Sequence, residues 1–183
     1  MDDLTLIPFG AKHLPSTVQW MDDPVILAGI LKNRIDSQFR LRVWVEDFYK
    51  QPNSVNFAIH NRGEHIGNIS LRNMNWKENR AEMMIYIGKD RGKGYGKLAT
   101  KMFLSYCFNV MMIPKIYVTV GEKNLIARRL YKKVGFADRG VFKNIFYQYG
   151  KYINVVKMVK KNENIRSTQA SERRLSRGLC RWV

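Results

Sequence analysis

The sequence has little cysteine, no long apolar run and few acidic residues. Its two cysteines, Cys107 and Cys180, allow at most one disulfide, which favours a reduced, cytoplasmic setting. No apolar run approaches the roughly 18 residues that span a bilayer, and the acidic start at Met1 to Asp3 is unlike a signal peptide. We therefore expect no membrane-spanning segment, and the residue pattern assigns no metal ligand.

The shortage of acidic residues leaves a formal net charge of +17, from 32 Lys and Arg against 15 Asp and Glu. Such an excess predicts an anionic partner: nucleic acid, an anionic surface or an acidic ligand. Residues 161–183 supply +4 of this charge and lack apolar periodicity, so they are predicted to form a disordered basic tail. Residues 1–160 keep +13 and are numerous enough for one domain with its own core.

Three glycines and three cations lie together in residues 91–97, RGKGYGK. The apolar run 83–87 before them predicts a buried strand, and the four-residue spacing of apolar side chains after them predicts a helix that begins near Gly94. A strand that turns into a helix through glycines leaves backbone N–H groups free at the positive end of the helix dipole. Residues 91–97 are therefore a candidate phosphate cradle.

Two known phosphate motifs do not fit this segment. Lys97 and Ala99 stand where a Rossmann pattern would need glycine, and the Gly-Lys-Ser/Thr of a P-loop is absent. A tight turn with solvated basic side chains remains the alternative.

Strands and helices follow from the apolar spacing along the chain. Short or alternating apolar runs predict strands at 4–9, 56–60, 65–71, 81–87, 114–120, 136–146 and 152–159. Helical spacing predicts helices at 13–20, at 42–50, from 94 and at 125–134, the last closed by Gly135. Residues 25–37 fit a loop with helical turns. The strand, helix, strand order around the cradle implies a right-handed crossover with locally parallel strands.

Three motifs then stand in one order along the chain. Arg91-x-x-Gly94-x-Gly96 follows a strand, Asn124-x-x-Ala127-x-x-Leu130-Tyr131 lies on the next helix, and Lys133-Val134-Gly135-Phe136 ends it. Together they resemble the GNAT superfamily of acyl-CoA-dependent N-acyltransferases, over roughly residues 4–160. The resemblance implies an α/β (α+β) fold, with a mixed, mostly antiparallel sheet of about seven strands, helices on both faces and a splay between the fourth and fifth strands.

The same resemblance implies that acetyl-CoA (coenzyme A) is the acyl donor. The cradle matches the loop that binds the pyrophosphate, and the strand end matches the segment that hydrogen-bonds the pantetheine arm. The cofactor-binding residues expected on this basis are Tyr86, Ile87, Arg91, Gly92, Lys93, Gly94, Tyr95, Gly96, Lys97, Asn124, Ala127, Arg128 and Lys133.

Acetyl transfer to an amine needs an unprotonated nitrogen, a stabilised oxyanion and a proton for the departing thiolate. The resemblance assigns the proton to Tyr131, whose ordinary pKa of about 10 lies above the value of about 8.5 for a thiol. Glu82, the only carboxylate on the strand that enters the cradle, is the candidate base, directly or through a water. Its alternative is a surface charge or a partner of Arg80. His60 and His65 flank a predicted hairpin and are expected at the surface.

The acceptor is less defined by the sequence. The resemblance implies an acceptor between the N-terminal helices and the last strands, where its pocket could be lined by Trp44, Phe48, Trp76 and Tyr147; ordinary core packing is the alternative. The branch resembled, marked by Trp20 with Asp23-Pro24 and the Gly150-Lys151-Tyr152 turn, acetylates ribosomal-protein N-termini, polyamines or nucleotide-linked amino sugars. Asn154 stands where many relatives carry an aspartate, which puts in doubt an acceptor bound through that carboxylate.

The leading hypothesis is direct acetyl transfer, in a ternary complex, to a small-molecule amine such as a nucleotide-linked amino sugar. A protein N-terminus of ribosomal type is the alternative acceptor. From another class, the basic tail could make the chain an RNA- or ribosome-binding module with a vestigial acyl-CoA site. We expect a monomer or homodimer and no membrane partner.

Overall fold

The computed structural model describes residues 3–35 and 38–163. The strands are β1 (Leu4–Pro8), β2 (Val55–Asn61), β3 (Glu64–Asn75), β4 (Arg80–Ile87), β5 (Lys115–Gly121), β6 (Ala137–Gln148) and β7 (Lys151–Lys161). The helices are the 3₁₀ turn η1 (Ala11–His13), α1 (Leu14–Trp20), α2 (Pro24–Gly29), α3 (Gln38–Tyr49), α4 (Tyr95–Asn109) and α5 (Leu125–Lys133). Every strand and helix expected from the apolar spacing is confirmed.

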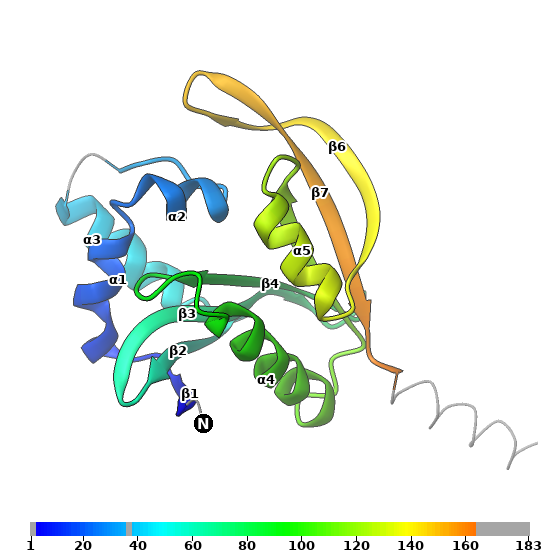
Figure 1. Cartoon of the computed structure of the whole chain (residues 1–183), viewed down its shortest axis with the longest axis horizontal. Coiled ribbons are helices and arrows are strands. Elements are labelled where there is room, and N and C mark those ends of the chain that lie inside the picture. The colour runs from blue at the N-terminus through cyan, green and yellow to red at the C-terminus, as the bar shows by residue number, and fades with distance from the viewer. Residues whose placement is uncertain (1–2, 36–37, 164–183) are drawn as a thin grey trace, which may run out of the picture.

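The strands form one seven-stranded sheet in the order β1-β2-β3-β4-β5-β7-β6 (Figure 1). Neighbours are antiparallel except β4 and β5, which are parallel. These two strands pair only where Ala81 faces Ile116 and Glu82 faces Tyr117, and they diverge beyond that point. The mixed sheet and the splay between the fourth and fifth strands are therefore confirmed.

Helices cover both faces of the sheet, as expected. On one face, Phe103 and Cys107 of α4 belong to a buried cluster that includes Met83 of β4. On the other face, helices α1 to α3 enclose a second cluster, to which β4 contributes Met84 and Tyr86. Because successive strand residues point to opposite faces, β4 serves both clusters. The strand that leads into the cradle is thus fixed from two sides.

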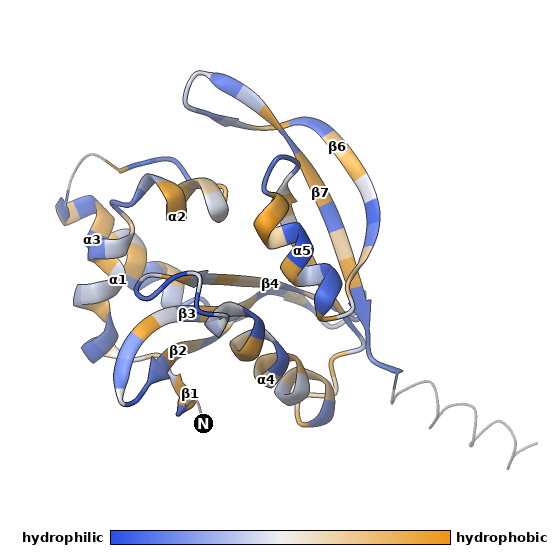
Figure 2. Ribbon diagram, in the orientation of Figure 1, coloured by the Kyte–Doolittle hydropathy of each residue, from blue (hydrophilic) through white to orange (hydrophobic). Residues whose placement is uncertain are grey.

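Strands β6 and β7 form a long hairpin that rises from the rest of the molecule (Figure 1). Its ribbon alternates between hydrophobic and hydrophilic residues (Figure 2), as a strand with one packed face should. Tyr149 and Gly150 turn the chain with φ of 48° and 77°, the left-handed conformation of a tight hairpin turn. The expected turn at residues 149–151 is confirmed.

Two segments differ from expectation. Residues 24–29, expected in a loop with helical turns, form the short helix α2, because Pro24 starts it and the Asp23 side chain accepts hydrogen bonds from the N–H groups of Val25 and Ile26. At the other end, β7 runs to Lys161, inside the expected tail, and the Asn162 side chain donates to the Phe108 carbonyl.

The rest of the expected tail, residues 164–183, lies outside the described residues, and so does Cys180. Cys107 is a buried free thiol, and burial raises its pKa to about 12. Within residues 3–35 and 38–163, no helix is long and apolar enough to cross a membrane, and no cluster of His, Cys, Asp and Glu could hold a metal ion.

Candidate active site

The cradle between β4 and α4 has the backbone of an anion site. Asp90, Gly92 and Gly94 have φ of 59°, 84° and 87°, so left-handed residues alternate along the loop. Such alternation turns successive N–H groups toward one concave side, and the first N–H groups of α4 have no acceptor within the helix. A side chain at Gly92 or Gly94 would strain this conformation. The geometry fits the pyrophosphate that the resemblance places here.

The basic side chains of the cradle have partners of their own. Arg91 pairs with Asp23, the cap of α2, and donates through Nε to the Ile87 carbonyl at 3.0 Å. The hydrogen bond from Arg91 lowers the pKa of Asp23. Lys93 lies 2.8 Å from Asp90, whereas Lys97 is exposed. Arg91 therefore ties the cradle to α2, a contact that the sequence did not suggest.

A second contact fixes the start of the loop. A Cβ at Gly88 would lie 2.1 Å from the Trp20 ring, so only glycine allows the indole of α1 to lie flat against the backbone there. The branch motif of Trp20 with Asp23-Pro24 is thus explained, because both Trp20 and Asp23 hold the cradle from the side of α1 and α2.

The open edge of β4 runs from the cradle into the splay. Ile87 and Tyr86 pair with β3 on one side, at Gly67 and Asn68. Their other backbone edge faces the splay, where an extended ligand arm could add as a strand. The Tyr86 side chain points away, because its hydroxyl bonds to the Asn68 amide at 2.7 Å and to the Tyr49 hydroxyl at 3.3 Å. Only the Tyr86 backbone is available to a cofactor arm.

Other expected cofactor residues also serve the fold. The Tyr95 side chain serves the fold, because its hydroxyl accepts from the Asn61 amide. Its backbone N–H lies at the start of α4, has no acceptor within the helix and is therefore available to an anion. Asn124 caps α5 by accepting from the Ala127 N–H at 3.1 Å. Arg128 lies 3.7 Å from Asp138, and Lys133 is exposed at the end of α5.

Glu82 lies at the base of the splay, where β4 and β5 separate. Its Oε1 accepts from the Thr119 hydroxyl at 2.7 Å, and its Oε2 accepts from the Asn73 amide at 3.0 Å. The Arg72 Nε lies 3.5 Å from the same Oε2. Arg80, the partner considered from the sequence, pairs with Glu78 instead, so that alternative is wrong. Both carboxylate oxygens of Glu82 are already engaged.

Tyr131 lies on α5, in the buried cluster, with 7% of its surface exposed. Burial and, to a smaller degree, the Glu82 carboxylate raise its pKa far above the ordinary value, while Arg72 opposes the rise. No described residue hydrogen-bonds to its hydroxyl. Tyr131 therefore stays protonated across the whole neutral range and keeps its proton free for a ligand.

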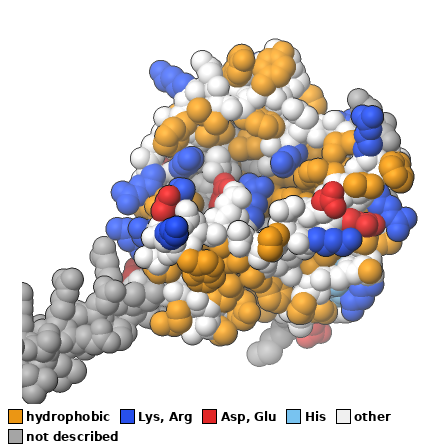
Figure 3. All heavy atoms as spheres, turned by 180° about the vertical axis from the view of Figure 1, so that it is seen from behind, with side chains coloured by type: hydrophobic (Ala, Val, Ile, Leu, Met, Phe, Trp, Pro, Cys, Tyr) orange, Lys and Arg blue, Asp and Glu red, His pale blue; other side chains and the backbone are white. Residues whose placement is uncertain are grey.

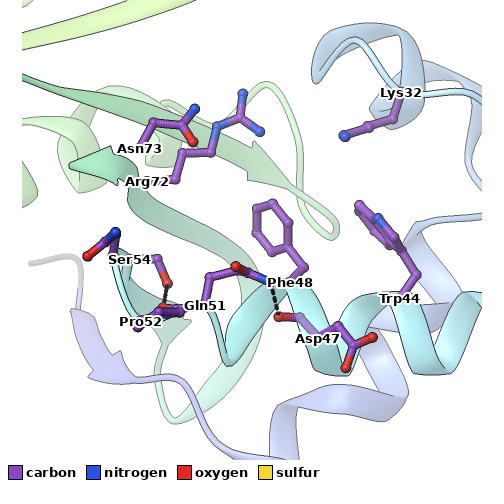
Figure 4. Close-up of a pocket in the computed structure, with 10 residues that line it drawn as sticks. Lys32, Trp44, Asp47, Phe48, Gln51, Pro52, Ser54, Arg72 and Asn73 are labelled. Atoms are coloured by element: carbon purple, nitrogen blue, oxygen red, sulfur yellow. Dashed lines mark hydrogen bonds between the residues drawn. The ribbon is translucent and has the colours of Figure 1, made fainter. Parts of the chain in front are cut away.

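A cavity of about 500 Å³ lies between α3 and β3, near the Glu82 end of the splay (Figure 4). Trp44 and Phe48 of α3 form one wall, Arg72 and Asn73 of β3 form the opposite wall, and Lys32 reaches in after α2. Trp44 and Phe48, which were expected to line the acceptor pocket, thus line one cavity together. The sequence did not predict Lys32, Arg72 and Asn73 as pocket residues. Lys32 lies in the segment 25–37, which was expected to be a loop with helical turns, and β3 was expected to stop at residue 71.

Two of the expected pocket residues lie outside this cavity. Trp76 is 59% exposed on the loop between β3 and β4. Tyr147 is 54% exposed on β6, where its ring lies 5.1 Å from the ring of Tyr152. The structure therefore does not bring these two aromatic residues to Trp44 and Phe48.

The histidines expected at the surface form a packed cluster instead. His60 is 7% exposed, and its Nε2 lies 3.2 Å from the Nε2 of His13, which is 1% exposed. His65 stacks on His60, and its Nε2 lies 2.9 Å from the Asn68 side-chain oxygen. Because α1 covers this part of β2 and β3, a hairpin position did not mean exposure. Through Asn68 the cluster connects to Tyr86.

Asn154 has a structural reason to be an amide. It donates to the Glu122 carboxylate at 2.9 Å and accepts from the Asn144 N–H at 3.0 Å. An aspartate could make only the second contact and would face Glu122 with like charge. The asparagine at position 154 is therefore explained by the contacts that join the end of β5 to the β6–β7 hairpin.

Comparison with known proteins agrees with this geometry. The sequence matches the family model "Acetyltransferase (GNAT) domain" over residues 3–137. The spermidine N(1)-acetyltransferase of Escherichia coli K12 is 28% identical over 136 residues, which cover 72% of this chain and 73% of that protein. The putative ribosomal N-acetyltransferase YdaF of Bacillus subtilis is 24% identical over 109 residues, covering 59% of this chain and 60% of that protein.

Among solved structures, the spermidine N-acetyltransferase of Vibrio cholerae, crystallised with CoA and spermine, superimposes with a TM-score of 0.80. The two chains are 24% identical, and the match covers 87% of this chain and 95% of that one. At this identity the likeness establishes the fold.

Proposed function

The chain belongs to the acetyltransferase (GNAT) family and is an N-acetyltransferase that uses acetyl-CoA, and we propose that it acetylates a small-molecule primary amine by direct transfer in a ternary complex. The observation that carries the proposal is the splay of β4 from β5, which pair at two positions only. The cradle lies at one end of the splay, and Glu82, Tyr131 and the aromatic cavity lie at the other. Donor and acceptor can therefore meet without a covalent enzyme intermediate.

In this mechanism each group of the chain has one task. The N–H groups of the cradle hold the pyrophosphate, and the open edge of β4 aligns the arm. Acetyl-CoA supplies an activated acyl group. Glu82 acts on the acceptor directly or through a water, because each of its oxygens accepts one hydrogen bond and keeps a further lone pair. Tyr131 gives its proton to the departing sulfur, since its hydroxyl is protonated and free of other partners.

The acceptor class is proposed from the charge of the chain. A nucleotide-linked amino sugar suits the +13 of residues 1–160, because its diphosphate needs cations. The names of two relatives point to other acceptors, spermidine for one and a ribosomal acceptor for the other. The RNA-binding alternative depends on residues 161–183, of which 164–183 lie outside the described residues.

An acceptor panel tests the proposal. The full chain is incubated with labelled acetyl-CoA and, separately, with a nucleoside-diphosphate amino sugar, spermidine and a ribosomal-protein N-terminal peptide. Free thiol and labelled product are measured together. We expect thiol release in step with label on the amino sugar. Thiol release no faster than hydrolysis with every amine would overturn the proposal.

A further inference from the structure

We propose that Lys32 and Arg72 form an anion subsite inside the acceptor cavity, so that the acetylated amine carries a phosphate or a carboxylate. This inference rests on the proposed function, because it names the chemistry of the acceptor that enters the same site. It is carried by the arrangement of two cations around one cavity.

The two cations come from different layers and face each other. Lys32 follows α2, and its main-chain oxygen is fixed by the Gln148 amide at 2.5 Å. Its ammonium lies 5.5 Å from the centre of the Trp44 ring. Figure 4 shows the Lys32 and Arg72 side chains directed toward one another above Phe48. A ligand in the cavity would therefore lie between two positive charges.

Lys32 has no direct ion-pair partner among the described residues, 3–35 and 38–163. Asp47, the acidic residue on the cavity wall, is exposed, and its carboxylate points away from both cations in Figure 4. Burial, followed by repulsion from Arg72, lowers the pKa of Lys32, and the Glu82 carboxylate opposes this shift only in part. A half-buried cation without an ion-pair partner is unfavourable. An anion that enters the cavity would therefore be attracted by both Lys32 and Arg72.

Arg72 can contact a ligand while it also contacts Glu82. Its Nε lies 3.5 Å from the Glu82 carboxylate but makes no hydrogen bond, although it is buried. A guanidinium has five N–H donors in a planar fork, which matches phosphate and carboxylate oxygens. Arg72 could thus hold Glu82 with one edge and an acceptor anion with the other.

The same arrangement disfavours a polyamine. Spermidine carries several ammonium groups, and one of them would have to lie near Lys32 and Arg72, where the nearby Glu82 carboxylate already accepts from Thr119 and Asn73 and pairs with Arg72. The relatives named for spermidine therefore need not share their acceptor with this chain. On the face of the molecule shown in Figure 3, Lys and Arg side chains outnumber those of Asp and Glu, in keeping with the net positive charge of the chain.

Matched acceptors test the subsite. Glucosamine, its 6-phosphate, its 6-carboxylate and spermidine are compared by kcat/KM, and their binding to the CoA-loaded full chain is measured by calorimetry. CoA keeps the cradle from binding the phosphate. We expect the anionic amines to exceed glucosamine by about tenfold, as a charged hydrogen bond implies, and spermidine to rank last. The phosphate and carboxylate arms decide which anion is preferred.

Three variants assign the effect to its residue. Lys32→Gln should remove most of the tenfold preference, and Lys32→Glu should reverse it in favour of spermidine. Lys77→Gln is the control, because Lys77 is exposed on the loop between β3 and β4. Equal binding and turnover of glucosamine and its anionic forms, or a preference unchanged in Lys32→Gln, would overturn the subsite. Absence of turnover with a preserved binding preference would instead overturn only the proposed function.

Discussion

Replacing His13 should change how the stability of the protein depends on pH. His13 accepts from the Gly10 N–H through Nδ1, so its single proton is on Nε2, which faces His60 at 3.2 Å. Burial, and then the charges of His65, His60 and Lys12, lower its pKa from 6.5 to about 4. A second proton would remove the Gly10 hydrogen bond and leave a buried charge.

The magnitude follows from linkage. Between pH 6.5 and 4 the unfolded chain binds a proton at His13 that the folded chain does not bind, so stability falls as the pH falls. At about 1.4 kcal/mol for each tenfold change in proton affinity, the change in pKa amounts to about 3 kcal/mol. This contribution is fully present above pH 6.5.

Urea unfolding at pH 7.5 and pH 4.5 measures the effect. His13→Gln cannot titrate, so its stability should fall between these pH values by about 2 to 3 kcal/mol less than that of the wild type. Lys12→Gln, at the neighbouring exposed position, should keep nearly the full wild-type fall. The same fall in wild type and His13→Gln would refute the reasoning.

Two further variants test contacts around the site. Asp23→Asn keeps the cap of α2 but loses the charge that holds Arg91. KM for acetyl-CoA should therefore rise about two- to fivefold, with little change in thermal stability. An unchanged KM would show that the ion pair does not position the cradle. Asn154→Asp places a second carboxylate against Glu122 and should cost about 1 to 3 kcal/mol in urea unfolding, a loss that Glu122→Gln in the same chain should largely restore.

Elements with a local signal were predictable from the sequence. The alternation of β2 and β3, the burial of Phe103 and Cys107 on α4 and the glycine turn before that helix each depend on nearby residues, and the structure confirms them, whereas Tyr106 and Val110 of the expected buried face are exposed. The helix α2 was missed because six residues are too few for a periodic pattern. Its start was nevertheless encoded, in the cap at Asp23 and the proline that follows.

Contacts between distant segments were not predictable in the same way. Lys32 and Arg72 come to one cavity only because the segment after α2 and strand β3 both line it, and neither residue stands in a motif. His60 appeared exposed because a hairpin says nothing about the helix that covers it. Trp76 was expected in the pocket because the resemblance places the acceptor between the N-terminal helices and the last strands, but its loop carries it outward. The assigned roles of Tyr131 and Glu82 stay predictions.

The most direct test of the account is the turnover of Tyr131→Phe with acetyl-CoA and its preferred amine, measured by thiol release. A general acid contributes about a hundredfold or more, so kcat should fall by at least that factor, while KM for acetyl-CoA changes by less than about twofold. Tyr106→Phe, on the exposed side of α4, should behave as wild type. An unchanged kcat in Tyr131→Phe would contradict the account.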